Sequence, residues 1–208
     1  MTRILYLHGF ASSPSSSKAR FFAERLRAAG AQVEIPDLAA GDFEHLTLTG
    51  QLRVIERAAG AGPVSLAGSS MGGYLAALYA ARHMEVRRVV LLAPAFRFAH
   101  RWAENIGAEA AIAWKQTPVE VFHYGEGRTR LLTHQLLEDG RAYEEFPDFH
   151  QPALIFHGAH DDVVPAQYSE HFAAAHPNAR LQVLDSGHDL LNMLDFMAPQ
   201  VCDFLTAP

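Results

Sequence analysis

Cysteine is nearly absent from this sequence, since Cys202 is the only one among 208 residues. A lone cysteine cannot form an intrachain disulfide, so the fold does not depend on an oxidising compartment. Its position in the largely apolar run 201–205 is typical of a small residue packed on a helix face. No cysteine and histidine stand at the spacing of metal ligands, so no metal site is expected.

Long apolar runs and an excess of positive charge are also missing. Only four consecutive apolar residues, 4–7, follow Arg3, fewer than a signal peptide needs, and no segment approaches the roughly 20 that span a membrane. A cytoplasmic location without a membrane span is expected. The net charge of −6 and the lack of common nucleic-acid-binding motifs indicate no nucleic acid partner. The composition does not indicate an oligomeric state.

What the sequence does have is a regular alternation of strand-like apolar runs and helix-like segments. Strands are expected at 3–7, 32–35, 64–67, 88–93, 153–156 and 180–184. Helices are expected at 18–29, 43–59, 71–83, 166–175 and 190–205. Continuous apolar runs separated by helices are typical of a parallel sheet covered on both faces. The sequence therefore predicts a single α/β domain over 1–208 with a six-stranded, mostly parallel sheet.

The stretch 96–151 interrupts this alternation. Within it, 119–124 and 128–133 flank Gly-Glu-Gly and are consistent with a hairpin, and a helix is possible at 135–145. An insertion of this length is often a lid or a binding element, so we expect a lid or cap here. Its aromatic residues, which fit either an acyl pocket or packing of the lid, are Phe96, Phe98, Trp102, Trp114, Phe122 and Tyr124.

A candidate nucleophile lies where the third expected strand runs into GSSMGG at 68–73. Gly68, Ser70 and Gly72 match the pattern G-x-S-x-G, in which a serine stands at a tight turn from strand to helix. The flanking positions must be small so that strand and helix can approach, and the helix N-terminus favours developing negative charge. Ser69 does not stand between glycines at this spacing, so the pattern selects Ser70.

The candidate acid and base follow later strands. Asp161 and Asp162 lie in the loop after the expected strand 153–156, and His188 lies beyond the last one, 180–184. The order serine, carboxylate, histidine is that of α/β-hydrolases, and the position favours Asp161 over Asp162. All three side chains would meet at the carboxyl edge of the sheet, where ligands bind in open α/β folds.

An oxyanion hole needs two backbone N–H groups. One is expected from Met71, which follows the nucleophile, and the other from Phe10 in the loop after the first strand. Gly9 would let that loop approach, and the side chains of Phe10 and Met71 would help to line a substrate pocket. His8 is expected to brace the loop rather than to act as the base.

Four ordered motifs carry a resemblance to a known family. They are HGF followed by SSP at 8–14, GSSMGG at 68–73, HGAHDDVVP at 157–165 and GH at 187–188. They resemble the small α/β-hydrolases, most closely the YqiA-like esterases and an abhydrolase-type thioesterase group. The resemblance implies a minimal α/β-hydrolase fold in which Ser70, His188 and Asp161 cleave small-molecule acyl esters or thioesters through an acyl-enzyme, without a cofactor.

Two other functions are compatible with the same motifs. The triad could serve acyl transfer, perhydrolysis or C–C hydrolysis, which product analysis with an alternative nucleophile would distinguish. A non-catalytic small-molecule-binding protein could also keep the pocket. The presence of Ser70, Asp161 and His188 together argues against that reading.

Overall fold

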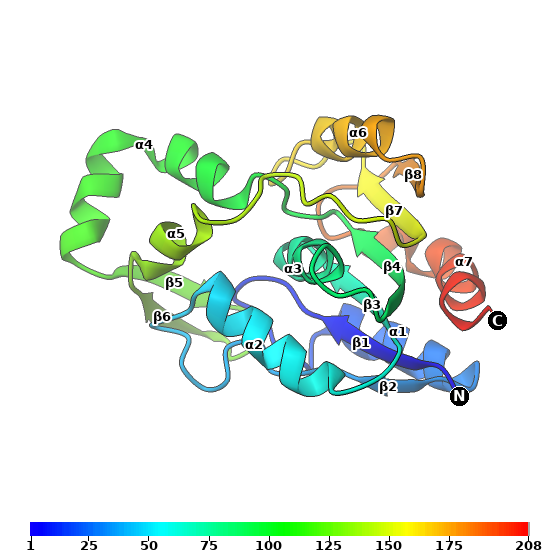
Figure 1. Cartoon of the computed structure of the whole chain (residues 1–208). Helices are drawn as coiled ribbons and strands as arrows, with labels where there is room; N and C mark the ends of the chain where they lie inside the picture. Colours follow the sequence, from blue (N-terminus) through cyan, green and yellow to red (C-terminus); the bar gives the residue numbers. More distant parts are fainter. Residues whose placement is uncertain (208) are drawn as a thin grey trace.

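A parallel sheet of six strands forms the centre of the computed structural model, which describes residues 1–207 (Figure 1). The strands are β1 (Arg3–Leu7), β2 (Gln32–Glu34), β3 (Val64–Ser69), β4 (Val86–Leu92), β7 (Ala153–Gly158) and β8 (Ala179–Leu184). Their order is β2-β1-β3-β4-β7-β8, and every neighbouring pair is parallel. The predicted six-stranded sheet is therefore confirmed.

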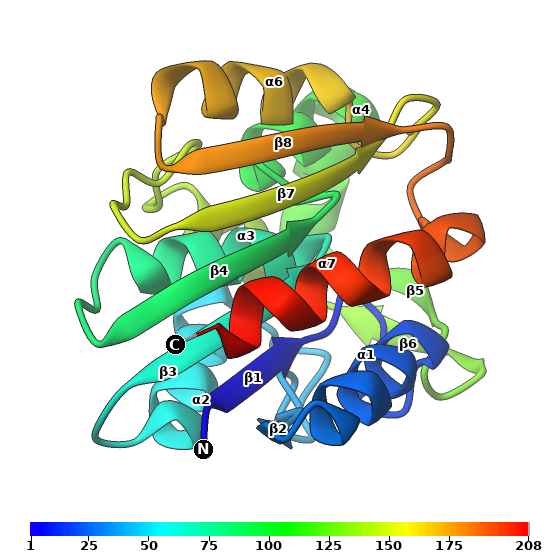
Figure 2. The ribbon, with the colours of Figure 1, turned by 90° about the vertical axis from the view of Figure 1, so that its right-hand side faces the viewer.

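Helices cover both faces of this sheet. On one face lie α1 (Ser17–Ala28) and α7 (Leu194–Thr206), which pack against each other (Figure 2). On the other lie α2 (Leu48–Ala59), α3 (Met71–Ala80) and α6 (Ala166–Ala175). Side chains of β1 alternate between the two faces: Ile4 and Tyr6 belong to the core under α1 and α7, and Leu5 and Leu7 to the opposite core. Burial on both faces explains the continuous apolar runs of the strands.

The direction in which successive strands are added to the sheet reverses at β1. From β1 the chain passes to β2 on one side and then returns to β3 on the other. The loops that leave the carboxyl ends of β1 and β3 consequently diverge, one toward α1 and the other toward α3. A crevice between such loops is the usual ligand site of an open α/β sheet.

A capping side chain and a backbone turn explain where two helices begin. The helix expected from residue 43 begins only at Leu48, because the Thr47 hydroxyl accepts a hydrogen bond from the Gly50 N–H at 3.0 Å. The last helix begins at Leu194 rather than Leu190, which has a φ of 57° and is followed by the short 3₁₀ turn η1 (Leu191–Met193).

Residues 96–151 lie between β4 and β7 and contain four elements. These are α4 (Phe98–Gln116), β5 (Val119–His123), β6 (Arg128–Leu132) and α5 (Gln135–Gly140). β5 and β6 pair antiparallel as the expected hairpin, whereas α4, which is kinked at Gly107, was not predicted. The indole N–H of Trp114 donates to the Leu132 carbonyl at 2.8 Å and ties α4 to the hairpin. The segment projects to one side of the sheet (Figure 1).

Among residues 1–207, no helix combines the length and the apolar character that crossing a bilayer requires.

Candidate active site

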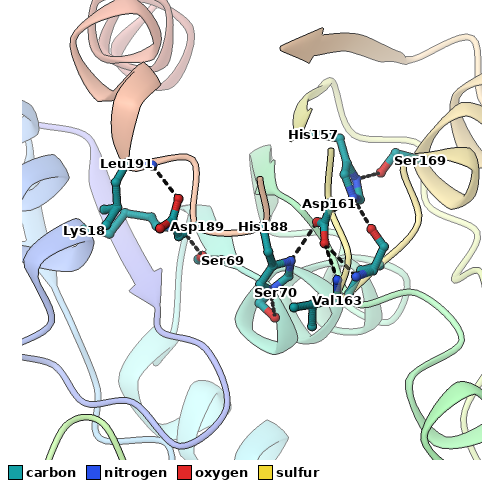
Figure 3. A network of polar contacts seen from close by, with 11 residues as sticks. Lys18, Ser69, Ser70, His157, Asp161, Val163, Ser169, His188, Asp189 and Leu191 are labelled. Atoms are coloured by element: carbon teal, nitrogen blue, oxygen red, sulfur yellow. Dashed lines mark hydrogen bonds and ion pairs between the residues drawn. The ribbon is translucent and has the colours of Figure 1, made fainter. Parts of the chain in front are cut away.

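Ser70 stands at the turn between β3 and α3 in a conformation that non-glycine residues rarely adopt. Its φ is 54° and its ψ is −117°, and its N–H donates to the Leu92 carbonyl at 2.8 Å. Backbone strain of this kind persists only where the surrounding structure enforces it, and it is typical of functional positions. The turn presents the Ser70 side chain at the carboxyl edge of the sheet (Figure 3).

The two glycines of the pattern permit this turn. A Cβ atom on Gly68 would overlap the backbone of Gly72, and one on Gly72 would overlap the carbonyl groups of Leu7 and His8. Both positions therefore require glycine because strand, helix and the loop after β1 come into direct backbone contact.

Gly72→Ala is accordingly expected to destabilise the fold, since the new methyl group can be accommodated only by moving backbone. We expect a loss of about 3 kcal/mol, or a fall in Tm of about 6–12 °C for a chain of this size. Gly187→Ala is the control, because an added Cβ there meets nothing within 4 Å. Equal Tm values for the two variants, measured by circular dichroism, would contradict this account.

The structure brings Ser70, His188 and Asp161 together in one hydrogen-bonded row. His188 Nε2 lies 2.9 Å from Ser70 Oγ, and His188 Nδ1 lies 2.7 Å from Asp161 Oδ2. Since the carboxylate can only accept, Nδ1 carries the proton and Nε2 is free to accept from the Ser70 hydroxyl. The row can therefore draw a proton from Ser70 toward His188.

The side chain of Asp161 is fully buried and receives several hydrogen bonds. Its Oδ1 accepts from the N–H groups of Val163 at 2.9 Å and Val164 at 2.7 Å. Burial by itself would raise the pKa of Asp161, but hydrogen bonds from His157, His188 and the Val164 N–H outweigh it and hold the pKa well below its usual range. Asp161 therefore stays ionised beside His188.

Asp162, the alternative carboxylate, is exposed and makes no contact with His188 among the described residues. It lies beside the pocket rather than behind the histidine. Of the two neighbouring carboxylates, only Asp161 therefore has the geometry to orient His188.

A role for His157 in the site was not predicted from the sequence. Its ring is fully buried, with Nε2 3.1 Å from Asp161 Oδ2 and 2.9 Å from the Val164 carbonyl, while Nδ1 lies 2.7 Å from the Ser169 hydroxyl. Nε2 therefore donates to these two acceptors, and the buried ring holds the Asp161 loop in place. The available signal was the His-Gly pair 157–158, which repeats the pair 8–9 at the end of another strand.

The loop after β1 lies directly beside Ser70. A Cβ built on Gly9 would stand 3.5 Å from Ser70 Cβ. His8 braces this loop, since Nδ1 donates to the Gly9 carbonyl at 3.0 Å and Nε2 accepts from the Leu38 N–H at 3.2 Å. The N–H groups of Phe10 and Met71 make no hydrogen bond to the other described residues, so both remain available to a ligand.

A pocket of about 1080 Å³ opens onto Ser70 and His188. Gly9, Phe10 and Met71 line it, as the sequence predicts, and Trp102 of α4 packs edge-on against the ring of Phe10. Trp114 does not reach the pocket; it is buried between Trp102 and the hairpin, with its N–H bound to a carbonyl. The segment 96–151 therefore supplies one wall of the pocket through Phe96, α4 and Tyr124.

Within residues 1–207, no group of three or more His, Cys, Asp or Glu side chains is arranged to hold a metal ion.

Solved structures with the same fold include enzymes that act on esters. Est1E from Butyrivibrio proteoclasticus, solved with ferulic acid bound, is 22% identical with a TM-score of 0.82, over 99% of this chain and 88% of that one. Mouse α/β hydrolase domain-containing protein 10 is 16% identical with a TM-score of 0.79, over 97% and 88%. A monoacylglycerol lipase from Paleococcus ferrophilus is 16% identical with a TM-score of 0.77, over 98% and 93%. These likenesses confirm the α/β-hydrolase fold.

Family membership follows from a match in sequence. No curated protein matches the chain. Residues 3–206 do match the uncharacterised protein family UPF0227, nearly from end to end. The chain therefore belongs to the UPF0227 family.

Proposed function

We propose that this protein is a serine hydrolase that cleaves small-molecule carboxylic esters or thioesters. The single observation that carries the proposal is the row Ser70–His188–Asp161, with hydrogen bonds of 2.9 and 2.7 Å, at the wall of a pocket. The names of the structural neighbours, an esterase and a lipase among them, agree with this class of reaction.

Ser70 is the nucleophile of the proposed reaction. His188 Nε2 takes the hydroxyl proton as Ser70 Oγ attacks the acyl carbon, and Asp161 stabilises the imidazolium that forms. His188 then gives the proton to the leaving alcohol or thiol, which departs and leaves the acyl group on Ser70. Water, activated by the same histidine, hydrolyses this acyl-enzyme and frees Ser70.

The backbone N–H groups of Phe10 and Met71 are the proposed oxyanion hole. Neither makes a hydrogen bond within residues 1–207, and the β1 loop lies against Ser70. They would donate to the oxygen that gains negative charge in the tetrahedral intermediate, and the N-terminus of α3 at Met71 adds a favourable dipole. This chemistry uses no cofactor.

The segment 96–151 is the proposed cap over the acyl group. Its side chains Phe96, Phe98 and Trp102 line the pocket together with Phe10. An apolar wall of this kind suits an acyl chain, because it removes the chain from water.

The test is hydrolysis of p-nitrophenyl esters of increasing acyl length, combined with labelling by a fluorophosphonate. We expect turnover with release of p-nitrophenol, and one covalent adduct per chain, located by mass spectrometry on the peptide that contains Ser70. Heat-denatured protein is the control for both readouts. An absence of turnover with esters and thioesters, together with an unlabelled Ser70, would refute the proposal. Product analysis with added alcohols separates hydrolysis from acyl transfer.

A further inference from the structure

The pocket has a second, polar wall formed by side chains that the proposed reaction does not use. Lys18, the second residue of α1, extends into it, and its Nζ donates to Ser69 Oγ at 3.0 Å. Figure 3 shows Lys18 beside Ser69 and Asp189, across from His188. Trp102 belongs to the apolar wall supplied by α4.

The ammonium group of Lys18 has unused hydrogen-bonding capacity. Its only hydrogen bond among residues 1–207 is the one to Ser69, and it forms no ion pair within 4.0 Å there. An ammonium carries three N–H donors, so two remain for a ligand. If Lys18 served only to join α1 to β3, we would expect a carboxylate in direct contact with it, because burying an unpaired charge is costly.

A second polar group in the same wall also lacks a partner. The Tyr6 hydroxyl, on a side chain that is 1% exposed, makes no hydrogen bond among the described residues. Tyr6 and Ser69 both line the pocket with Lys18. Burial raises the pKa of Tyr6 and outweighs the opposing effect of the Ser69 side chain, so the phenol keeps its proton and remains a donor.

The buried ammonium of Lys18 and the N-terminus of α1 favour an anion at this place, and they act against the nearby carboxylates Asp189 and Asp161. Burial lowers the pKa of Lys18 to about 8, against the opposing pull of Asp189 and Asp161. The first turn of α1 contains no acidic residue, so its positive dipole end is not neutralised there. An added negative group would raise the pKa of Lys18 and satisfy its free donors.

We propose that Lys18 and the Tyr6 hydroxyl form a subsite for a carboxylate carried by the ester substrate. This inference rests on the proposed function and narrows it to esters with a second, anionic group. The two carboxylate oxygens accept from Lys18 Nζ and from Tyr6 OH, while the scissile ester lies at Ser70. The carboxylate can belong to the leaving alcohol or to the acyl part, and the experiment separates these sources.

The kinetic test uses two matched pairs of substrates. In the first pair, para-(butyryloxy)benzoate is compared with its methyl ester, so that the charge lies on the leaving group. In the second, phenyl hydrogen adipate is compared with methyl phenyl adipate, so that it lies on the acyl part. The measured quantity is the ratio of kcat/KM for the anionic ester to that for the neutral ester. This ratio cancels effects of a variant that act on both esters.

We expect Lys18→Met to lower this ratio about tenfold in one of the two pairs, since hydrogen bonds to a charged group are lost. Lys115→Met is the control: this lysine is exposed on α4 and outside the pocket, and its replacement should leave the ratio unchanged. A ratio that Lys18→Met leaves unchanged in both pairs would overturn the subsite.

The pH dependence of the wild type gives a readout that needs no variant. The ratio should decline as pH rises through about 8, where Lys18 loses its proton. Asp161 and Asp189 act on Lys18, and the other charged or titratable groups that line the pocket near it include Tyr6, Arg101, Asp162 and His188. Carboxylates stay ionised from about pH 7 to about pH 9.5, Tyr6 keeps its proton, and any change at His188 affects both esters. A ratio that is constant over this range contradicts the inference.

A binding measurement separates failure of the subsite from failure of the proposed function. The non-hydrolysable amide para-butyramidobenzoate should raise the Tm of the wild type more than the neutral para-butyramidobenzamide does, and the difference should vanish in Lys18→Met. N-phenyl adipamate and its neutral amide test the acyl side in the same way. If no ester is hydrolysed, this comparison still decides the subsite, and equal shifts within both pairs reject it.

Discussion

Ser70→Ala is expected to lower kcat for p-nitrophenyl ester hydrolysis by about 10⁶-fold. The hydroxyl is the only group within reach of His188 Nε2 in the described structure that can form an acyl-enzyme, at 2.9 Å. Alanine removes this oxygen without adding bulk to the strained turn, so the Tm should stay close to that of the wild type. Steady-state kinetics and circular dichroism on the same preparation check both expectations.

Ser15→Ala is the matched control for this change. Ser15 is exposed and does not line the pocket, so its replacement should leave kcat within about twofold, as is usual for surface positions. If Ser70→Ala kept substantial turnover, another residue would be the nucleophile and the proposed roles of His188 and Asp161 would lose their basis.

Asp161→Asn is expected to lower kcat about 10⁴-fold. The N–H groups of Val163 and Val164 donate to Oδ1 of Asp161, so they will hold the amide oxygen of an asparagine in that place. The NH₂ group must then face His188 Nδ1, which has to accept. His188 would carry its proton on Nε2, directed at Ser70, and could no longer take the proton of the hydroxyl.

Asp162→Asn separates this effect from a simple loss of negative charge. Asp162 is the adjacent carboxylate and is exposed, so kcat should fall less than tenfold. Equal losses in the two variants would show that charge near the pocket matters rather than the tautomer of His188.

The wild type and Asp161→Asn are also expected to differ in how their stability depends on pH in acid. The pKa of Asp161 is held below its usual range in the fold, so its ionised form contributes stability above its unfolded pKa of about 4. That contribution is lost as pH falls toward the folded pKa. The difference in free energy of unfolding between wild type and Asp161→Asn should therefore be present near neutral pH and shrink below about pH 4. Urea unfolding at a series of pH values measures it.

Tertiary contact decided several features that local patterns did not reveal. Helix α4 was not predicted because it buries only Ala99 and Trp114 and is interrupted by Gly107, so it has no periodic apolar face. Trp114 resembled Trp102 in the sequence, yet it packs inside the segment 96–151 because its indole N–H finds the Leu132 carbonyl.

The sequence by itself determined the six-stranded sheet, the turn at Ser70 and the order in which Asp161 and His188 follow. These depend on local spacing: buried parallel strands need continuous apolar runs, and the turn needs glycine on either side of the serine. Position in the sequence also favoured Asp161 over Asp162, but only the tertiary structure shows how Asp161 contacts His188 and that Lys18 faces the pocket. These outcomes depend on contacts between residues far apart in the chain, and adjacent carboxylates with the same local pattern can point to opposite surroundings.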